Sequence, residues 1–379
     1  MKIKTGNKIS TRLIALLLFI VSGGGPLAAQ SPAGQAAFSA DEYARAIYKS
    51  QTLIDSMMDS QNIPGVEIAV SVEGQRVWSQ GFGFAGLEQK VPVWLATKMR
   101  IGSVSKSLTS VALGVLIEQG QLDIDAPIRK YVPYFPQKKY TITTRQVAGH
   151  LAGIRHYRGD EFLSAKHYES VKSGLQIFMN DSLLSKPGEK YEYSTYGWNL
   201  ISAVIEGASG QSYLKFMEEN VLKPLGMHET VADYNKPIIS HRTEFYTLDD
   251  NQQVINAPFV DNSYKWAGGG YLGTARDLLK FGNALLGDEY LEPETVDLLW
   301  EAQTTNDGEK TDYGMGWLSG TDNQGRYWVG HSGGSVGGTT QFVILPKKEV
   351  VVAILSNLSE VDYNDIQLKI AGLFIMNKP

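Results

Sequence analysis

A serine and a lysine three residues apart, Ser103 and Lys106, have the residue types and the spacing for nucleophilic catalysis. A hydroxyl needs a base before it can attack a carbonyl carbon, and residues three apart on a helix share one face. Ser103 opens an apolar segment, so the helix dipole would stabilise negative charge on its oxygen. A lysine in the first turn of a buried helix has a lowered pKa, because burial penalises its charged form. The alternative is a cap serine beside a solvated lysine.

Three other local patterns resemble nucleophile motifs but lack the residues that would complete them. The pair Ser212 and Lys215 repeats the spacing where a loop enters a helix on a polar surface, and an N-cap explains that serine. Two Gly-x-Ser-x-Gly matches occur, at 330–334 and 333–337. An α/β-hydrolase needs a histidine after its serine, and none follows His331.

The sequence indicates neither an organic cofactor nor a metal. The glycine pattern at 268–273 matches a dinucleotide fingerprint, but no strand precedes it, so close backbone packing beside a helix explains it better. The histidines show no tight metal-ligand spacing. His150 and His156 leave a zinc pair open, although a structural role is the favoured interpretation. We therefore expect a site without cofactor or metal.

The elements that must position these residues are predicted at both ends of the chain. A buried helix is expected over 104–119, because that segment is apolar all round and ends at Gly120. Alternating apolar residues predict a hairpin over 66–72 and 76–82. Other elements are expected as helices over 41–60 and 365–376 and as strands over 327–329, 339–345 and 349–355.

Strands at both ends with a largely helical middle predict a mixed α/β (α+β) fold. We expect an antiparallel sheet flanked by helices, built from about 41–100 and 310–379. A second, mostly helical lobe would span about 101–310, with a cleft between the two.

The first thirty residues are typical of a secretory leader. Basic residues precede a short apolar run at 13–21, and small residues follow up to Ala29. That run is far shorter than the roughly 20 residues that cross a bilayer. We expect a signal peptide over 1–29, a linker over 30–40, and an exported protein, periplasmic or secreted, with no membrane span in the mature chain. An uncleaved anchor is the alternative.

Charge and cysteine content exclude some classes of protein. The 379 residues carry a formal net charge of −5, which argues against a nucleic-acid partner. The chain has no cysteine, which rules out disulfides, a thiol nucleophile and thiolate metal sites.

Several ordered motifs resemble the penicillin-binding-protein and class C β-lactamase superfamily of serine hydrolases. The resemblance covers essentially all of residues 41–370. It is carried by the segments 100–106, 122–127, 142–154, 187–199, 224–227, 313–317 and 330–334. The phrases at 154–157 and 264–270 are most similar to the branch that includes a mitochondrial serine β-lactamase-like protein of animals. The resemblance implies a β-lactamase/transpeptidase-like fold.

The resemblance also implies roles for individual residues. Ser103 would form an acyl-enzyme and Lys106 would ease the removal of its proton. Tyr193 would be the general base, its phenolate favoured by neighbouring cations. The backbone N–H groups of Ser103 and Gly334 would form an oxyanion hole. His331 would hold a substrate carboxylate or tune Tyr193.

Two positions depart from the family pattern. Thr195 replaces an asparagine and offers one short hydroxyl, and His331 replaces a lysine and is largely neutral at pH 7. Thr195, Ser332 and His331 complete the predicted substrate-binding set, but both departures weaken the grip on an anionic β-lactam. A core aromatic for Tyr193 and a turn histidine for His331 are the structural alternatives.

These observations predict a serine hydrolase that acts on a small-molecule, peptide (amide) or ester substrate, peptidase-like rather than a resistance β-lactamase. A weak β-lactamase or an esterase is the alternative within enzymes. A non-catalytic scaffold is the alternative outside them, since the animal relative forms filaments. A homo-oligomer is left open.

Overall fold

The computed structural model describes residues 37–38 and 43–375, within one compact unit that spans residues 34–379. The predicted signal peptide lies outside the described residues. Of the predicted linker, only strand β1 (Ala37–Phe38) is described, and it pairs with the sheet. The leader, the linker and the lobe boundaries stay predictions. Within residues 43–375 no helix is both long and apolar enough to cross a membrane.

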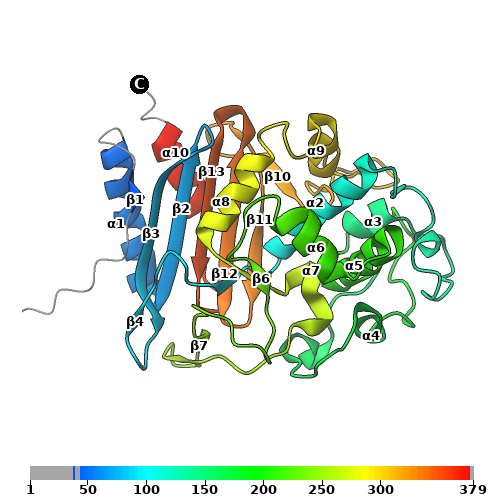
Figure 1. The fold of residues 1–379 in the computed structure, drawn as a ribbon, viewed down its shortest axis with the longest axis horizontal. Coiled ribbons are helices and arrows are strands. Elements are labelled where there is room, and N and C mark those ends of the chain that lie inside the picture. The colour runs from blue at the N-terminus through cyan, green and yellow to red at the C-terminus, as the bar shows by residue number, and fades with distance from the viewer. Residues whose placement is uncertain (1–36, 39–42, 376–379) are drawn as a thin grey trace, which may run out of the picture. The chain divides into compact units, whose positions relative to one another are not determined.

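The main sheet joins the two ends of the chain (Figure 1). Its strands follow the order β1-β3-β2-β13-β12-β11-β10, with β4 paired to β3, and every neighbouring pair is antiparallel. The strands after β1 are β2 (Gly65–Val72), β3 (Gln75–Gly86), β4 (Val91–Pro92), β10 (Leu318–Thr321), β11 (Tyr327–Ser335), β12 (Gly338–Leu345) and β13 (Val350–Ser356). The predicted mixed α/β fold with an antiparallel sheet is confirmed.

Strand β13 shows why this sheet forms. Its sequence is almost entirely β-branched or aliphatic, and every residue is buried. Because side chains alternate across a strand, Val350, Val352 and Ile354 enter one core cluster, and the residues between them enter the other. The first cluster contains α1 (Ala44–Gln61) and α10 (Ile366–Ile375), and the second contains α2 (Val104–Glu118) and α8 (Ala275–Ala284). The sheet is therefore covered by helices on both faces (Figure 1).

Most of the regular secondary structure in the middle of the chain is helical, as predicted. Its longer helices are α5 (Thr195–Ser209) and α9 (Pro293–Trp300), besides α2 and α8. Its shorter helical pieces are η2 (Ile128–Lys130), α3 (Thr144–Ala148), η3 (Gly159–Leu163), α4 (Val171–Leu175), α6 (Tyr213–Met217), η4 (Glu218–Leu222), η5 (Ser263–Lys265) and α7 (Trp266–Gly269). Its small strands are β5 (Met99–Arg100), β6 (Val231–Ala232), β7 (Tyr246–Leu248), β8 (Val254–Asn256) and β9 (Tyr271–Gly273), and η6 (Pro346–Lys348) links β12 to β13.

Candidate active site

Ser103 stands at the start of α2, and its hydroxyl is directed to Lys106 rather than to the helix end. Gly102, with a φ of +51°, makes the turn into the helix, and a Cβ there would lie 2.8 Å from the Gly334 carbonyl oxygen. Ser103 already has helical dihedral angles and makes no side-chain cap hydrogen bond. Its Oγ instead lies 2.9 Å from Lys106 Nζ. The cap-serine alternative therefore does not describe this position.

Lys106 is completely buried, and its nitrogen has three polar neighbours. Nζ lies 2.6 Å from the Gly268 carbonyl oxygen, 3.2 Å from Thr195 Oγ1 and 2.9 Å from Ser103 Oγ. Burial, and then the charge of Lys265, hold the pKa of Lys106 well below its usual value. A neutral amine has two N–H donors and one lone pair. As an ammonium Lys106 donates to all three oxygens; once it loses a proton, two donors still match Gly268 and Thr195, and the lone pair can accept the Ser103 proton.

Tyr193 and Thr195 are placed by the start of α5. Ser194 caps that helix, because its hydroxyl accepts from the Gly197 N–H at 2.9 Å. The Tyr193 ring centroid lies 4.9 Å from Lys106 Nζ. Burial raises the pKa of Tyr193, and its hydrogen bond with Ser103 only partly opposes that rise. Burial thus favours the neutral phenol of Tyr193, whereas the resemblance implied a phenolate favoured by neighbouring cations.

His150 and His156, which the sequence places in a loop, hydrogen-bond to the backbone at the start of α5. His150 Nδ1 accepts from the Ser194 N–H at 3.1 Å, and His156 Nδ1 accepts from the Thr195 N–H at 3.3 Å. Burial and then Lys106 lower both pKa values, that of His156 to about 4. Among residues 43–375 no group of three metal-ligating side chains occurs. Each ring thus accepts from a backbone N–H at the start of α5 and helps to hold that segment.

His331 is a neutral, fully engaged histidine in β11. Its Nδ1 lies 2.6 Å from the Ser332 carbonyl oxygen, which only an N–H can approach, so Nδ1 is the donor. Nε2 then accepts from the Tyr313 hydroxyl at 2.9 Å. Burial and then Lys106 lower the pKa of His331 to about 3. Holding a substrate carboxylate, as the resemblance implied, would require a proton that this ring does not have.

The predicted site residues on β11 lie next to the nucleophile because the backbone of β11 packs against the start of α2. Strand β10 pairs with β11 only as far as Gly330, so beyond that residue the outer edge of β11 has no partner strand. The chain there lies close to α2, since a Cβ on Gly333 would be 3.3 Å from Ser103 N. Ser103, Tyr193, Thr195, His331, Ser332 and Gly334 all line one cavity of about 370 Å³. The structure thus brings all the predicted site residues together. These six line the cavity, and Lys106 is buried next to Ser103.

Sequence reasoning missed several residues of this cavity. Gly268 supplies the carbonyl oxygen that accepts from Lys106, and Lys265, Tyr157, Phe162 and Tyr313 line the walls. The glycine run at 268–270 was the only local signal. The run is preceded by η5 and not by a strand, as predicted, and its first two glycines belong to α7. The packing explanation is correct, because a Cβ on Gly268 would lie 2.6 Å from Thr195 Cγ2.

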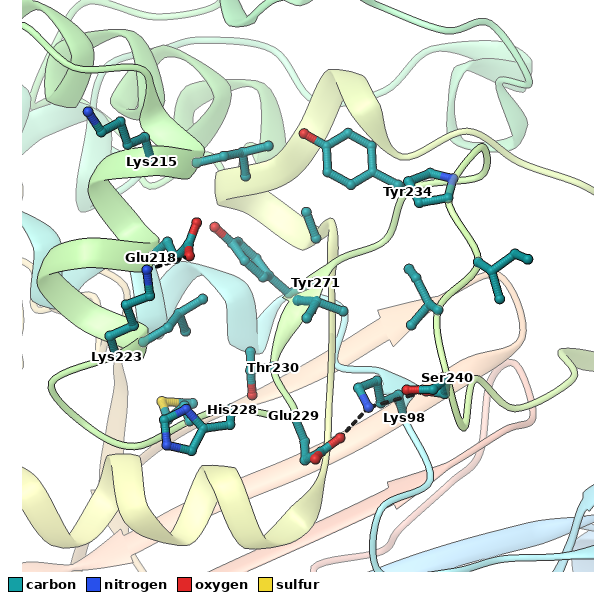
Figure 2. Close-up of a pocket in the computed structure, with 18 residues that line it drawn as sticks. Lys98, Lys215, Glu218, Lys223, His228, Glu229, Thr230, Tyr234, Ser240 and Tyr271 are labelled. Atoms are coloured by element: carbon teal, nitrogen blue, oxygen red, sulfur yellow. Dashed lines mark hydrogen bonds and ion pairs between the residues drawn. The ribbon is translucent and has the colours of Figure 1, made fainter.

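Lys215 of the second Ser-x-x-Lys pair lines a different, larger cavity of about 680 Å³ (Figure 2). Ser212 does precede α6, but its side chain makes no cap hydrogen bond. The larger cavity shares no lining residue with the catalytic one. Two of its lysines are ion-paired, Lys98 with Glu229 and Lys223 with Glu218, so the charges at its rim are largely balanced.

We expect Gly268→Ala to lower kcat by about 10- to 100-fold, because a displaced carbonyl would shift Lys106 away from Ser103. The added Cβ would press on Thr195 Cγ2 at 2.6 Å and on the Thr195 carbonyl oxygen at 3.0 Å. Steady-state kinetics on any ester that the wild type hydrolyses would measure the loss. Gly287→Ala is the matched control, because a Cβ there meets nothing within 4 Å. Equal kcat values for the two variants would contradict this placement of Lys106.

The sheet with helices on both faces, and a serine–lysine pair at the start of a buried helix, define the β-lactamase-fold class of serine hydrolases. The chain belongs to the β-lactamase family, whose model matches residues 51–371. It is 34% identical to the human mitochondrial serine β-lactamase-like protein LACTB, over 87% of this chain and 80% of that protein.

Two further relatives are bacterial or archaeal. Penicillin-binding protein 4* of Bacillus subtilis is 28% identical, over 87% of this chain and 76% of that protein. An octameric penicillin-binding protein homologue from Pyrococcus abyssi is 26% identical, with a TM-score of 0.76, over 87% of this chain and 77% of that one.

Proposed function

We propose that this chain is a serine hydrolase that cleaves a peptide (amide) or ester bond through an acyl-enzyme on Ser103. One observation carries the proposal. A completely buried lysine, with both of its N–H donors matched, presents its nitrogen 2.9 Å from Ser103 Oγ. Such a pair is built to activate a hydroxyl.

The reaction then follows from the positions of these groups. Lys106 Nζ takes the Ser103 proton as Oγ attacks the carbonyl carbon. The oxyanion faces the backbone N–H groups of Ser103 and Gly334, which we assign as the oxyanion hole. The bond to the leaving nitrogen or oxygen breaks as Lys106 returns the proton to it. Water then attacks the acyl-enzyme by the same route, and the acid is released.

Tyr193 has a different part in this scheme from the one that the resemblance implied. Burial raises its pKa, and its hydroxyl interacts with Ser103 Oγ. A neutral phenol at that place orients the serine hydroxyl, while Lys106 carries the proton to the leaving group. Lys106, whose pKa burial lowers, is the base.

The residues at positions 195 and 331 favour a peptidase-like activity over antibiotic hydrolysis. Thr195 and the uncharged His331 bind an anionic β-lactam less strongly than the asparagine and the lysine that the family pattern has at these positions. A weak β-lactamase and an esterase are the alternatives within enzymes. A panel of peptide anilides, short esters and nitrocefin separates them, and a preference for nitrocefin would overturn the peptidase assignment.

We expect a fluorophosphonate probe to add once to the protein, at Ser103. The reason is that only a hydroxyl with a neighbouring base attacks such a probe readily. Intact-protein and peptide mass spectrometry give the stoichiometry and the site, and Ser103→Ala is the control that should stay unlabelled. Labelling at another serine, or none, would favour the non-catalytic scaffold.

A homo-oligomer is proposed as well, since the Pyrococcus abyssi homologue is described as octameric. Export stays a prediction, because the leader lies outside the described residues and the human relative is named as mitochondrial. Light scattering of the purified chain tests the oligomeric state. N-terminal sequencing of the secreted or periplasmic fraction tests export and cleavage of the leader.

A further inference from the structure

Lys265 is a buried lysine in the catalytic cavity that no neighbouring residue neutralises. It ends η5, directly before α7, and lines the same cavity as Ser103. The residue is 2% exposed. In the described part of the chain its ammonium makes no ion pair and no hydrogen bond, and it contacts three aromatic rings. A buried charge without a partner is rare in proteins, because desolvation is costly.

The aromatic rings stabilise the ammonium without neutralising it. Its Nζ lies 4.6 Å from the ring centroid of Phe162, 5.4 Å from that of Tyr264 and 5.7 Å from that of Tyr157. Ring faces attract a cation but carry no net charge. Since the side chain lines the same cavity as Ser103, an anion bound in that cavity lies within reach of the ammonium.

The carboxylate that acts on Lys265, that of Asp233, is already ion-paired with two arginines: Arg100 contacts its Oδ2, and Arg242 Nη1 lies 3.9 Å from its Oδ1. Asp233 accepts from Arg100 Nε at 2.7 Å and from Asn262 Nδ2 at 2.8 Å. Burial, and then the positive charge of Arg100, lower the pKa of Lys265 to about 7, and Asp233 only partly opposes them. The cation therefore still lacks an anion.

The rest of the cavity adds no negative charge. Among the residues of known placement that line it, none is Asp or Glu. Its two histidines are neutral at pH 7, since their pKa values are lowered to about 4 for His156 and about 3 for His331. The larger cavity offers a contrast, because its lysines Lys98 and Lys223 are paired with glutamates (Figure 2).

We propose that Lys265 binds a carboxylate of the substrate, so that the substrates cleaved at Ser103 are peptides or esters with a carboxylate close to the scissile bond. The proposal rests on the hydrolase function proposed above. A carboxylate fits better than a phosphate, because one unpaired ammonium balances one negative charge and not two. Lys265 is thus a specificity-determining residue, and it binds the substrate at the position that the neutral His331 cannot serve.

The test uses substrates that differ only in this carboxylate. N-acetyl-glutamyl and N-acetyl-glutaminyl 4-nitroanilides, in both the L and D configurations, have the same shape and the same leaving group. At pH 6.5 we expect the wild type to prefer the glutamyl substrate, and Lys265→Met to reduce the glutamyl-to-glutaminyl ratio of kcat/KM by about 10- to 100-fold, mainly through KM. Lys223→Met, which removes an ion-paired lysine of the larger cavity, should leave the ratio unchanged. A Lys265→Met ratio equal to that of the wild type overturns the proposal.

A binding measurement separates this proposal from the hydrolase function. In Ser103→Ala protein, calorimetric titration with the α-amides of N-acetyl-glutamate and N-acetyl-glutamine, which differ only in the side-chain carboxylate, needs no turnover. We expect tighter binding of the glutamate, lost in Ser103→Ala/Lys265→Met, and Lys265→Gln serves if the methionine variant fails to fold. Lysine-dependent binding without hydrolysis of any substrate would refute the hydrolase function alone. Equal binding of the two ligands would refute the role of Lys265.

Discussion

Ser103→Ala is expected to lower kcat by about 10⁴- to 10⁶-fold, because it removes the atom that would form the acyl-enzyme. The fold should be unaffected, because the Ser103 side chain makes no cap hydrogen bond. Steady-state kinetics on the best substrate of the panel, with thermal unfolding of both proteins, measure the two effects.

The matched control for that variant is Ser105→Ala. Ser105 lies two residues further along the same helix, is fully buried, and its hydroxyl has no hydrogen-bond partner. Its replacement should change kcat less than twofold. A Ser103→Ala protein that keeps more than about one percent of the wild-type kcat would contradict the nucleophile assignment, given the usual size of such losses.

Replacing Lys106 by methionine or by arginine should each lower kcat by about 10³-fold or more. The two variants distinguish a base from a charge. Arginine keeps a positive charge but cannot give up its proton in a protein, whereas methionine keeps the shape without the charge. If Lys106 is the base, both variants are equally inactive. Substantial activity in Lys106→Arg would mean that Lys106 acts only as a fixed cation.

Two pH measurements accompany the Lys106 variants. Burial lowers the pKa of Lys106, so the wild-type kcat/KM should fall as the pH drops through that value and the amine gains a proton. The same lowered pKa affects stability. The unfolded chain binds more protons at this residue than the folded one between the lowered value and the ordinary one, so this contribution destabilises the fold at neutral pH and diminishes as the pH rises. Lys106→Met should therefore unfold at a temperature no lower than that of the wild type.

How far the sequence predicts this site depends on how local each contact is. The Ser103–Lys106 pair lies within one helical turn, and the alternating residues of β11 to β13 determine the sheet, so both were predictable. Lys265 was not, because its surroundings come from η3, η5 and the segment before η3, which meet only in the fold. The protonation states of the site residues could not be predicted from the sequence either. Tyr193 was expected as a phenolate from the cations nearby, whereas its burial, which a sequence does not show, decides the matter.

The pairing of β2 with β13 has a consequence for how this chain is made. All seven residues of β13 pair with β2, from Val350 opposite Val72 to Ser356 opposite Val66. The hairpin of β2 and β3 is synthesised first, yet its inner edge has no partner until almost the whole chain has left the ribosome. An apolar strand with an unpaired edge is prone to associate with other chains. Renaturation yield should therefore fall steeply with protein concentration, and a chain shortened before β13 should aggregate rather than fold.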